Sequence, residues 1–209
     1  MVMKNRKKIL IISLTLLASF TCAAETVTKG MKKVIDDALD FSVKQSMSMF
    51  YEMKDQKGIL PRTAENGKMI TCESAWWTSG FYPGTLWYCY EYSNDPQIRA
   101  AAEEMTSRVE KQKYTTSNHD VGFIINCSFG NGYRLTHNET YRKVIETAAK
   151  SLSTRFHPVT GCTRSWNSKK WQFSVIIDNM MNLELLNVAS SLTGDNTYYN
   201  MAKSHAGRT

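Results

Sequence analysis

The chain has 209 residues, 42% of them hydrophobic, which is enough for one domain with a buried core. Its formal net charge is +7, but residues 1–24 hold four basic and no acidic side chains, so the remainder carries only +3. The remaining Lys and Arg residues are scattered without interleaved aromatic side chains, which argues against a nucleic-acid partner.

The segment 1–24 has the layout of a secretory signal peptide. A basic start up to Lys8 is followed by the apolar run 9–20 and by the small residues Ala23 and Ala24. This run is too short to span a membrane comfortably. We expect cleavage near Ala24, export to the periplasm, and a catalytic domain over 25–209. A lipid anchor on Cys22 and full secretion are the alternatives.

The rest of the chain predicts helix after helix. Apolar stretches (75–92, 120–129 and 175–192) alternate with amphipathic ones (96–112, 138–155 and 196 onward), after a first helix over 29–53. Each amphipathic helix begins with a polar cap, at Asn94-Asp95, His137-Asn138 and Gly194-Asp195. The segments 58–67 and 158–170 are expected to be loops, as are Asn66-Gly67 and Asn131-Gly132. This alternation predicts an all-α array of helical hairpins, open as a solenoid or closed as a toroid.

Four cysteines follow the signal sequence, and none forms a Cys-x-x-Cys pair or lies at zinc-site spacing from a histidine. We expect buried, free thiols at Cys72, Cys89, Cys127 and Cys162. A disulfide formed after export is the alternative, and the sequence does not pair it.

A repeat carries two carboxylates. Leu135-Thr136-His137-Asn138-Glu139-Thr140-Tyr141 returns later in the chain as Leu192-Thr193-Gly194-Asp195-Asn196-Thr197-Tyr198. Asp120 precedes the first copy by almost the same distance along the chain as Asp178 precedes the second. Equivalent positions of stacked hairpins share one rim, so the two Asp are expected to lie together. Two carboxyl groups on one rim are the minimal equipment for acid–base chemistry on a sugar.

Each Asp also has a structural explanation. Asp120 stands before an apolar helix and could be its N-cap. Asp178 is expected inside an apolar helix, where a charge is costly unless it is paired or faces a wet cleft. Asn179 and Asn182 in the same turn favour the lining of a cavity.

Aromatic side chains accompany both Asp. Trp77 lies near the same register of its own unit and is expected to face the same cavity, and Trp166 precedes Asp178 in a loop. Tryptophan faces stack on the C–H groups of sugars, although core packing would also explain Trp77. His119 is as well suited to a structural hydrogen bond as to a ligand contact.

These residues resemble one family, the unsaturated glucuronyl hydrolases of glycoside hydrolase family 88. The resemblance rests on four motifs in order across the segment 77–182: Trp77-x-x-x-Phe81-x-Pro83-Gly84, His119-Asp120-x-Gly122-Phe123, Thr163-x-x-Trp166 and Ile177-Asp178-Asn179-Met180-Met181-Asn182. It covers essentially all of 25–209 and implies an (α/α)6 toroid with a central site. The chain has about half the length that this family needs, so we expect a fragment, and its own activity is left open.

The resemblance implies a substrate and residue roles. The substrate would be an oligosaccharide left by a polysaccharide lyase, with a C4=C5 unsaturated uronate at its non-reducing end and glycosaminoglycan as its source. Asp178 would protonate C4 and activate the water that adds to C5, and the resulting hemiketal would open to release the next sugar. Asp120 would bind the sugar ring. The implied sugar-lining residues are Trp77, Phe81, His119, Thr163 and Trp166, and no metal or organic cofactor is implied.

Two further functional interpretations remain open. A related unsaturated rhamnogalacturonyl hydrolase would share the fold and the chemistry but act on a pectin-derived substrate. A helical-array protein that binds sugars without catalysis would tolerate Asn at both Asp120 and Asp178.

Overall fold

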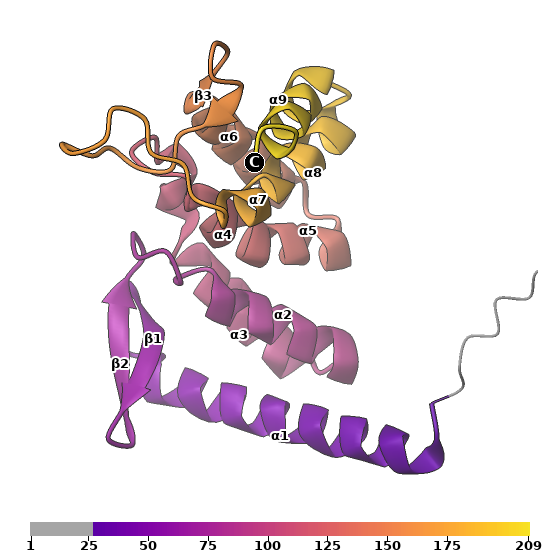
Figure 1. Cartoon of the computed structure of the whole chain (residues 1–209). Helices are drawn as coiled ribbons and strands as arrows, with labels where there is room; N and C mark the ends of the chain where they lie inside the picture. The colour runs from indigo at the N-terminus through magenta and orange to yellow at the C-terminus, as the bar shows by residue number, and fades with distance from the viewer. Residues whose placement is uncertain (1–26) are drawn as a thin grey trace, which may run out of the picture.

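The computed structural model describes residues 27–209 (Figure 1). The predicted signal peptide and Cys22 lie outside the described residues. The elements are α1 (Lys29–Met53), β1 (Ile59–Glu65), β2 (Lys68–Glu73), α2 (Phe81–Ser93), α3 (Pro96–Ser107), the 3₁₀ helix η1 (Glu110–Tyr114), α4 (Val121–Ile125), the π-helical turn η2 (Asn126–Gly130), α5 (Asn131–Thr136), α6 (Glu139–Ser153), β3 (Phe156–His157), β4 (Cys162–Thr163), α7 (Asn179–Asn182), α8 (Glu184–Thr193) and α9 (Asn196–Ala206).

The predicted alternation of helices is confirmed. The apolar segments α2, α4–η2–α5 and α7–α8 pack in sequence order, and each is followed by its amphipathic partner α3, α6 or α9 (Figure 1). The three predicted caps are equivalent, because Asp95, Asn138 and Asp195 each accept a hydrogen bond from the backbone N–H two residues later, at 2.8, 2.9 and 2.8 Å. Three similar hairpins therefore underlie the sequence repeat.

Glycines allow successive apolar segments to approach closely. A Cβ on Gly84 would lie 2.6 Å from the carbonyl oxygen of Cys127, so α2 and η2 meet backbone to backbone. A Cβ on Gly80 would overlap the backbone of Ile124, and one on Gly122 would overlap the backbone of Asn182. Only glycine fits at these crossings, where the start of α2 meets the end of α4 and the start of η2, and the start of α4 meets the end of α7.

Two buried clusters hold the hairpins together. The larger lies between α4, α6 and α8 and includes Ile125, Phe129, Leu152 and Leu186. The smaller joins α1, α2 and α3 around Trp87, which is fully buried and donates its indole N–H to the Thr106 hydroxyl at 2.9 Å. Burial of this apolar surface is the main stabilising contribution to the array.

The expectation of a loop over 58–67 is wrong. The strands β1 and β2 form an antiparallel hairpin, with Leu60 opposite Cys72 and Glu65 opposite Lys68. Asn66 and Gly67 make its turn, with φ of 50° and 73°. Asn-Gly is the pair that two-residue hairpin turns prefer, so this signal was present in the sequence without clear alternation beside it.

The first and third apolar helices begin later than predicted, whereas the second, predicted over 120–129, continues through η2 and α5 to Thr136. The first begins at Phe81 instead of 75, and the third begins at Asn179 instead of 175. Residues 174–176 are not helical because they bond to the segment after β4: Ser165 donates its N–H to the Ser174 carbonyl, and its hydroxyl accepts from the Ile176 N–H. Asn131-Gly132 opens helix α5 and is not a loop.

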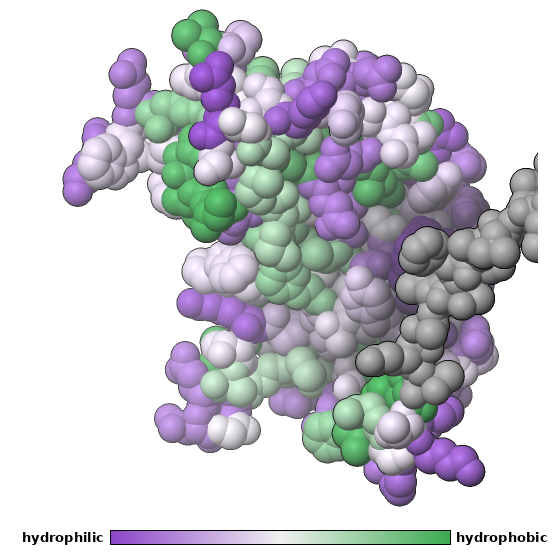
Figure 2. Space-filling view, turned by 45° about the vertical axis from the view of Figure 1, so that its right-hand side comes forward, coloured by the Kyte–Doolittle hydropathy of each residue, from purple (hydrophilic) through white to green (hydrophobic). Residues whose placement is uncertain are grey.

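Some apolar side chains of the described residues remain at the surface. On α1 these include Met31, Val34, Ile35 and Phe41, and Figure 2 shows apolar groups on the lower part of the molecule, where α1 lies. Among residues 27–209, no helix is both long and apolar enough to cross a membrane. The four described cysteines are free thiols, and only Cys89 of the four is buried.

Candidate active site

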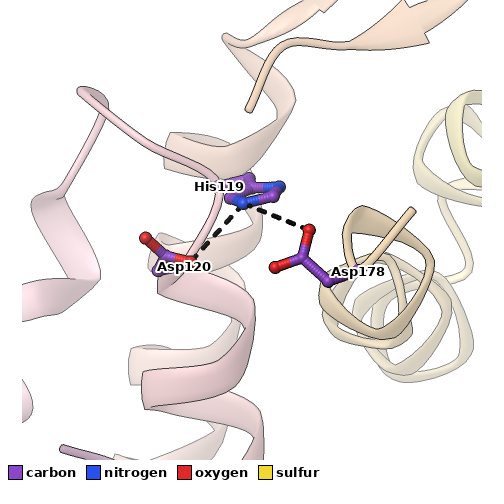
Figure 3. Close-up of side chains that lie close together, drawn as sticks. All are labelled: His119, Asp120 and Asp178. Atoms are coloured by element: carbon purple, nitrogen blue, oxygen red, sulfur yellow. Dashed lines mark ion pairs between the residues drawn. The ribbon is translucent and has the colours of Figure 1, made fainter. Parts of the chain in front are cut away.

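Asp120 and Asp178 converge on one imidazole (Figure 3). Nε2 of His119 lies 3.5 Å from Oδ1 of Asp120 and 3.7 Å from Oδ1 of Asp178. The prediction that equivalent positions of two hairpins bring the two Asp together is therefore confirmed by the geometry. The side chains are 21% and 38% exposed, so both carboxyl groups can reach a ligand from solvent while His119, at 1%, lies behind them.

Both Asp hold the same local position. Asp120 immediately precedes α4 and Asp178 immediately precedes α7, yet neither side chain caps its helix. The expectation that Asp178 lies inside a helix is wrong by one turn, and the N-cap role considered for Asp120 is absent. An Asp at a helix start that leaves the free N–H groups to other partners is available for chemistry.

Asn182 takes over part of the capping. Its Oδ1 accepts the N–H of Phe123, in the first turn of α4, at 2.8 Å. Its amide donates to the Asp178 carbonyl at 3.4 Å. Asn182 therefore ties the helix that presents Asp120 to the helix that presents Asp178. Asn179 and Asn182 are both fully buried, so they brace the site and do not line a cavity as predicted.

Burial dominates the electrostatics of the pair. Burial raises the pKa of Asp120, the neighbouring Asp178 raises it further, and His119 and Arg155 oppose this. Burial lowers the pKa of His119 against the pull of both Asp, so the imidazole is neutral at pH 7. Oδ1 of Asp178 is buried and accepts no hydrogen bond from the described residues. Two carboxyl groups in such different surroundings suit different roles in one reaction.

We expect Asp120→Asn to stabilise the fold at pH 7. Because the folded pKa of Asp120 lies above its unfolded value, the native state holds the proton more tightly, and its contribution to stability is lost as pH rises through that raised pKa. The amide removes this loss, so the unfolding free energy and the thermal midpoint at pH 7 should both rise.

The measurement is thermal unfolding by circular dichroism at pH 4 and pH 7. The gain should be clear at pH 7 and small at pH 4, and Asp55→Asn in an exposed turn should change neither midpoint. His119 acts in the opposite direction: its folded pKa is lowered, so its contribution is complete above about 6.5 and is lost at lower pH. An Asp120→Asn protein that is less stable at pH 7 would contradict the assignment of a costly buried charge.

Aromatic rings pack on residues close in sequence to the carboxyl pair. The Trp166 ring stands edge-on to His119 at 6.0 Å between ring centres. Trp77 and Phe81 pack on Phe123, in the first turn of α4 after Asp120, at 6.0 and 5.5 Å. Trp77 and Trp166 are 43% and 38% exposed, as stacking platforms for a sugar would be. Thr163, predicted to line the sugar site, has no exposed surface and lies behind it.

The cluster also has the chemistry of a metal-binding set. One ligand atom each from His119, Asp120 and Asp178 lies within 4.8 Å of the others. One imidazole and two carboxylates are donors that zinc and manganese accept. Carboxyl groups gather without a metal in acid–base sites as well, so the donor set alone does not assign an ion.

A separate cavity of about 900 Å³ lies between α1, the β1–β2 hairpin and the start of α2. Phe81 and Thr78 contribute to its wall, but Asp120 and Asp178 do not. The carboxyl pair therefore lies outside this cavity. Phe81 lines the cavity and also packs on Trp77 and Phe123.

Two supporting residues were missed in the sequence. Arg155 is 8% exposed and donates to the carbonyls of Thr116 and Arg164, at 2.6 and 2.8 Å, which joins the segment before His119 to the segment before Trp166. His205 is fully buried and accepts the Thr163 N–H at 2.9 Å. Arg155 and His205 lie at the ends of predicted amphipathic helices. The hydrophobic periodicity of those helices predicts that polar side chains face solvent, so it does not predict that these two are buried.

The comparisons with known proteins agree with this geometry. No family model matches the chain. It is 46% identical over 136 residues to an unsaturated glucuronyl hydrolase of Formosa agariphila, which is 64% of this chain and 34% of that protein. It is 34% identical over 178 residues to an unsaturated chondroitin disaccharide hydrolase of Streptococcus pyogenes, covering 82% of this chain and 44% of the relative.

The solved structures give the same result for the fold. A heparin-specific unsaturated glucuronyl hydrolase matches 83% of this chain with a TM-score of 0.76 and 38% identity, over 48% of its own length. The chain thus spans less than half the length of these relatives, and its three hairpins correspond to about half of an α/α toroid. In both sequence and fold, the chain is a partial-length relative of the unsaturated glucuronyl hydrolases.

Proposed function

We propose that the protein is an unsaturated glucuronyl hydrolase that acts on lyase-generated oligosaccharides of glycosaminoglycan origin. The observation that carries the proposal is the carboxyl pair: two Asp at equivalent helix starts, neither used as a cap, within 3.5 and 3.7 Å of one imidazole nitrogen. The names of the relatives support this substrate class, since they include chondroitin disaccharide and heparin-specific enzymes.

The proposed reaction is hydration of the terminal uronate. Asp178 gives its proton to C4 of the C4=C5 enol ether, and positive charge develops at C5. The same carboxylate then takes a proton from the water that forms the new C5–O bond, which regenerates the acid. The resulting C5 hemiketal opens the ring, and the hemiacetal left at C1 releases the next sugar. Overall, one water is consumed, and no oxidant or reductant is required.

The other residues bind and orient in this proposal. Burial raises the pKa of Asp120, which would accept hydrogen bonds from the ring hydroxyls when ionised and donate one to them when protonated. Trp77, Phe81 and Trp166 would hold the ring faces. His119, neutral and behind both carboxyl groups, would fix the positions of Oδ1 of Asp120 and Oδ1 of Asp178, because its Nε2 lies close to both.

Export is a further part of the proposal. A basic start, an apolar run over 9–20 and Ala23-Ala24 support a cleaved signal peptide and a periplasmic enzyme. N-terminal sequencing of the protein recovered from the periplasm should begin near Glu25. Recovery of the full chain from the cytoplasm alone would contradict export.

The test of the reaction is loss of the near-ultraviolet absorbance of the conjugated C=C. Purified protein with a helical circular dichroism spectrum is mixed with unsaturated disaccharides derived from chondroitin, from heparin and from rhamnogalacturonan. We expect the absorbance to decay with the first two. Decay with the rhamnogalacturonan-derived sugar alone would favour the pectin-derived substrate, and a folded protein inactive on all three would contradict the proposal for this chain.

A further inference from the structure

His205 lies beyond the motifs of the site but at its back. It belongs to the last turn of α9, and its side chain is fully buried against β4. A histidine in the last turn of an amphipathic outer helix would normally face water. Buried polar groups normally have hydrogen-bond partners, so the contacts of this ring indicate why it is buried.

One ring nitrogen has a defined partner. The backbone N–H of Thr163 donates to Nδ1 of His205 at 2.9 Å. Nδ1 must therefore be unprotonated, so the neutral ring carries its proton on Nε2. Burial lowers the pKa of His205, and a positive charge on His119 would lower it further, which preserves Nδ1 as an acceptor at neutral pH.

A second hydrogen bond links Thr163 to the residue beside Asp178. The carbonyl of Thr163 accepts the side-chain amide of Asn179 at 2.7 Å. Asn179 directly follows Asp178, and both Thr163 and Asn179 are fully buried. Two hydrogen bonds, one to the N–H and one to the carbonyl of Thr163, thus connect His205 to Asn179, the residue next to the proposed acid.

The same stretch of chain also holds His119. The N–H of His119 donates to the Ser165 carbonyl at 2.8 Å, and the N–H of Ser165 donates to the Ser174 carbonyl at 2.8 Å. The segment from Thr163 to Ser165 is therefore bonded on one side to His119 and on the other to the irregular segment 174–176, which leads to Asp178. A shift of the segment 163–165 would therefore move both His119 and Asp178.

Four buried polar atoms of these residues have no hydrogen-bond partner among the described residues: Nδ1 of His119, Oγ1 of Thr163, Oδ1 of Asn179 and Nε2 of His205. Buried polar atoms are costly when they are not paired, so apolar packing alone does not account for these four residue types around the segment 163–165.

We propose that His205 is a positioning residue for Asp178. It orients Asp178 through the backbone of Thr163 and the side chain of Asn179. The proposal rests on the proposed function, in which Asp178 is the acid. No hydrogen bond joins His205 directly to Asp178. Its role is to hold Thr163, so that a residue of α9 fixes the position of a carboxyl group at the start of α7.

Two variants separate positioning from packing. His205→Asn places an amide oxygen where Nδ1 lies and keeps the acceptor, whereas His205→Leu fills similar space and removes it. His157→Asn is the matched control, because His157 is exposed. All three are measured in the full chain, beside the wild type.

The first readout does not depend on activity. In the wild type, ¹⁵N spectra of the four histidines should show His205 as the neutral tautomer protonated on Nε2, and the Thr163 amide should exchange slowly with deuterium. His205→Leu should speed this exchange by about 10-fold, as loss of one hydrogen bond implies, and shift the Asp178 carboxyl resonance. His205→Asn should restore both, and His157→Asn should change neither.

The second readout is turnover of the unsaturated chondroitin disaccharide. His205→Leu should lower kcat by about 10–100-fold with a smaller change in KM, and His205→Asn should recover most of the loss. A wild-type His205 protonated on Nδ1, or a Leu variant that matches the wild type in exchange and carboxyl shift, overturns the proposal even if the variant is less stable. If the wild type consumes no substrate, the proposed function fails, and the spectra alone decide the positioning role.

Discussion

Asp178→Asn is expected to lower the rate of absorbance loss by about 10³-fold, the contribution typical of a positioned general acid–base group. Asn matches the shape of Asp but cannot give a proton to C4 or take one from water. The fold should be retained, because Oδ1 of Asp178 accepts no hydrogen bond from the described residues and its side chain is 38% exposed.

The comparison is made at equal protein concentration with the unsaturated chondroitin disaccharide. Asp55→Asn makes the same chemical change in an exposed turn away from the pair and should leave the rate unchanged. A rate for Asp178→Asn within a few fold of the wild type would remove Asp178 from the reaction. Unchanged sugar binding by variants with Asn at both Asp120 and Asp178, without turnover by any form, would instead favour a binding protein.

Gly122→Ala should strongly destabilise the fold. A Cβ at Gly122 would overlap the carbonyl oxygen of Asn182 and lie 2.6 Å from its Cα, and neither can yield as a flexible side chain would. The two backbones must separate, and with them the helix starts that present Asp120 and Asp178. We expect a loss of about 3 kcal/mol, at the upper end of overpacking effects.

The measurement is urea unfolding followed by circular dichroism, with turnover measured on the folded fraction. Gly30→Ala is the control, because a Cβ at Gly30 in α1 meets no atom within 4 Å. It should leave stability unchanged or raise it by up to about 1 kcal/mol through helix propensity. Equal stabilities of the wild type and Gly122→Ala would show that the α4–α7 contact is looser than described.

The sequence predicts those parts of the fold that rest on local signals. The caps at Asp95, Asn138 and Asp195 define the outer helices, and the first helix has its predicted bounds. The pairing of Asp120 with Asp178 follows from the spacing of the repeat, since equivalent positions of similar hairpins must lie side by side. The resemblance in four short motifs adds what spacing does not indicate: the toroid to which the three hairpins correspond in part, and the reaction proposed above.

The sequence does not predict features that depend on contacts distant along the chain. The segment 174–176 is irregular because Ser165 bonds to it, although the sequence predicts an apolar helix from residue 175. The burial of His205 depends on Thr163, which lies far from it in the sequence. The turn at Asn66-Gly67 carried a local signal, but its strands are half exposed and do not alternate clearly.

The most direct test of the central claim follows two signals in one reaction. The unsaturated chondroitin disaccharide is incubated with the protein while C=C absorbance and free amino sugar are measured together. Hydration at C4=C5 predicts that absorbance falls in step with sugar release, one for one, and that both cease in Asp178→Asn. Sugar released while the absorbance persists would indicate ordinary glycosidic hydrolysis and contradict the proposed role of Asp178.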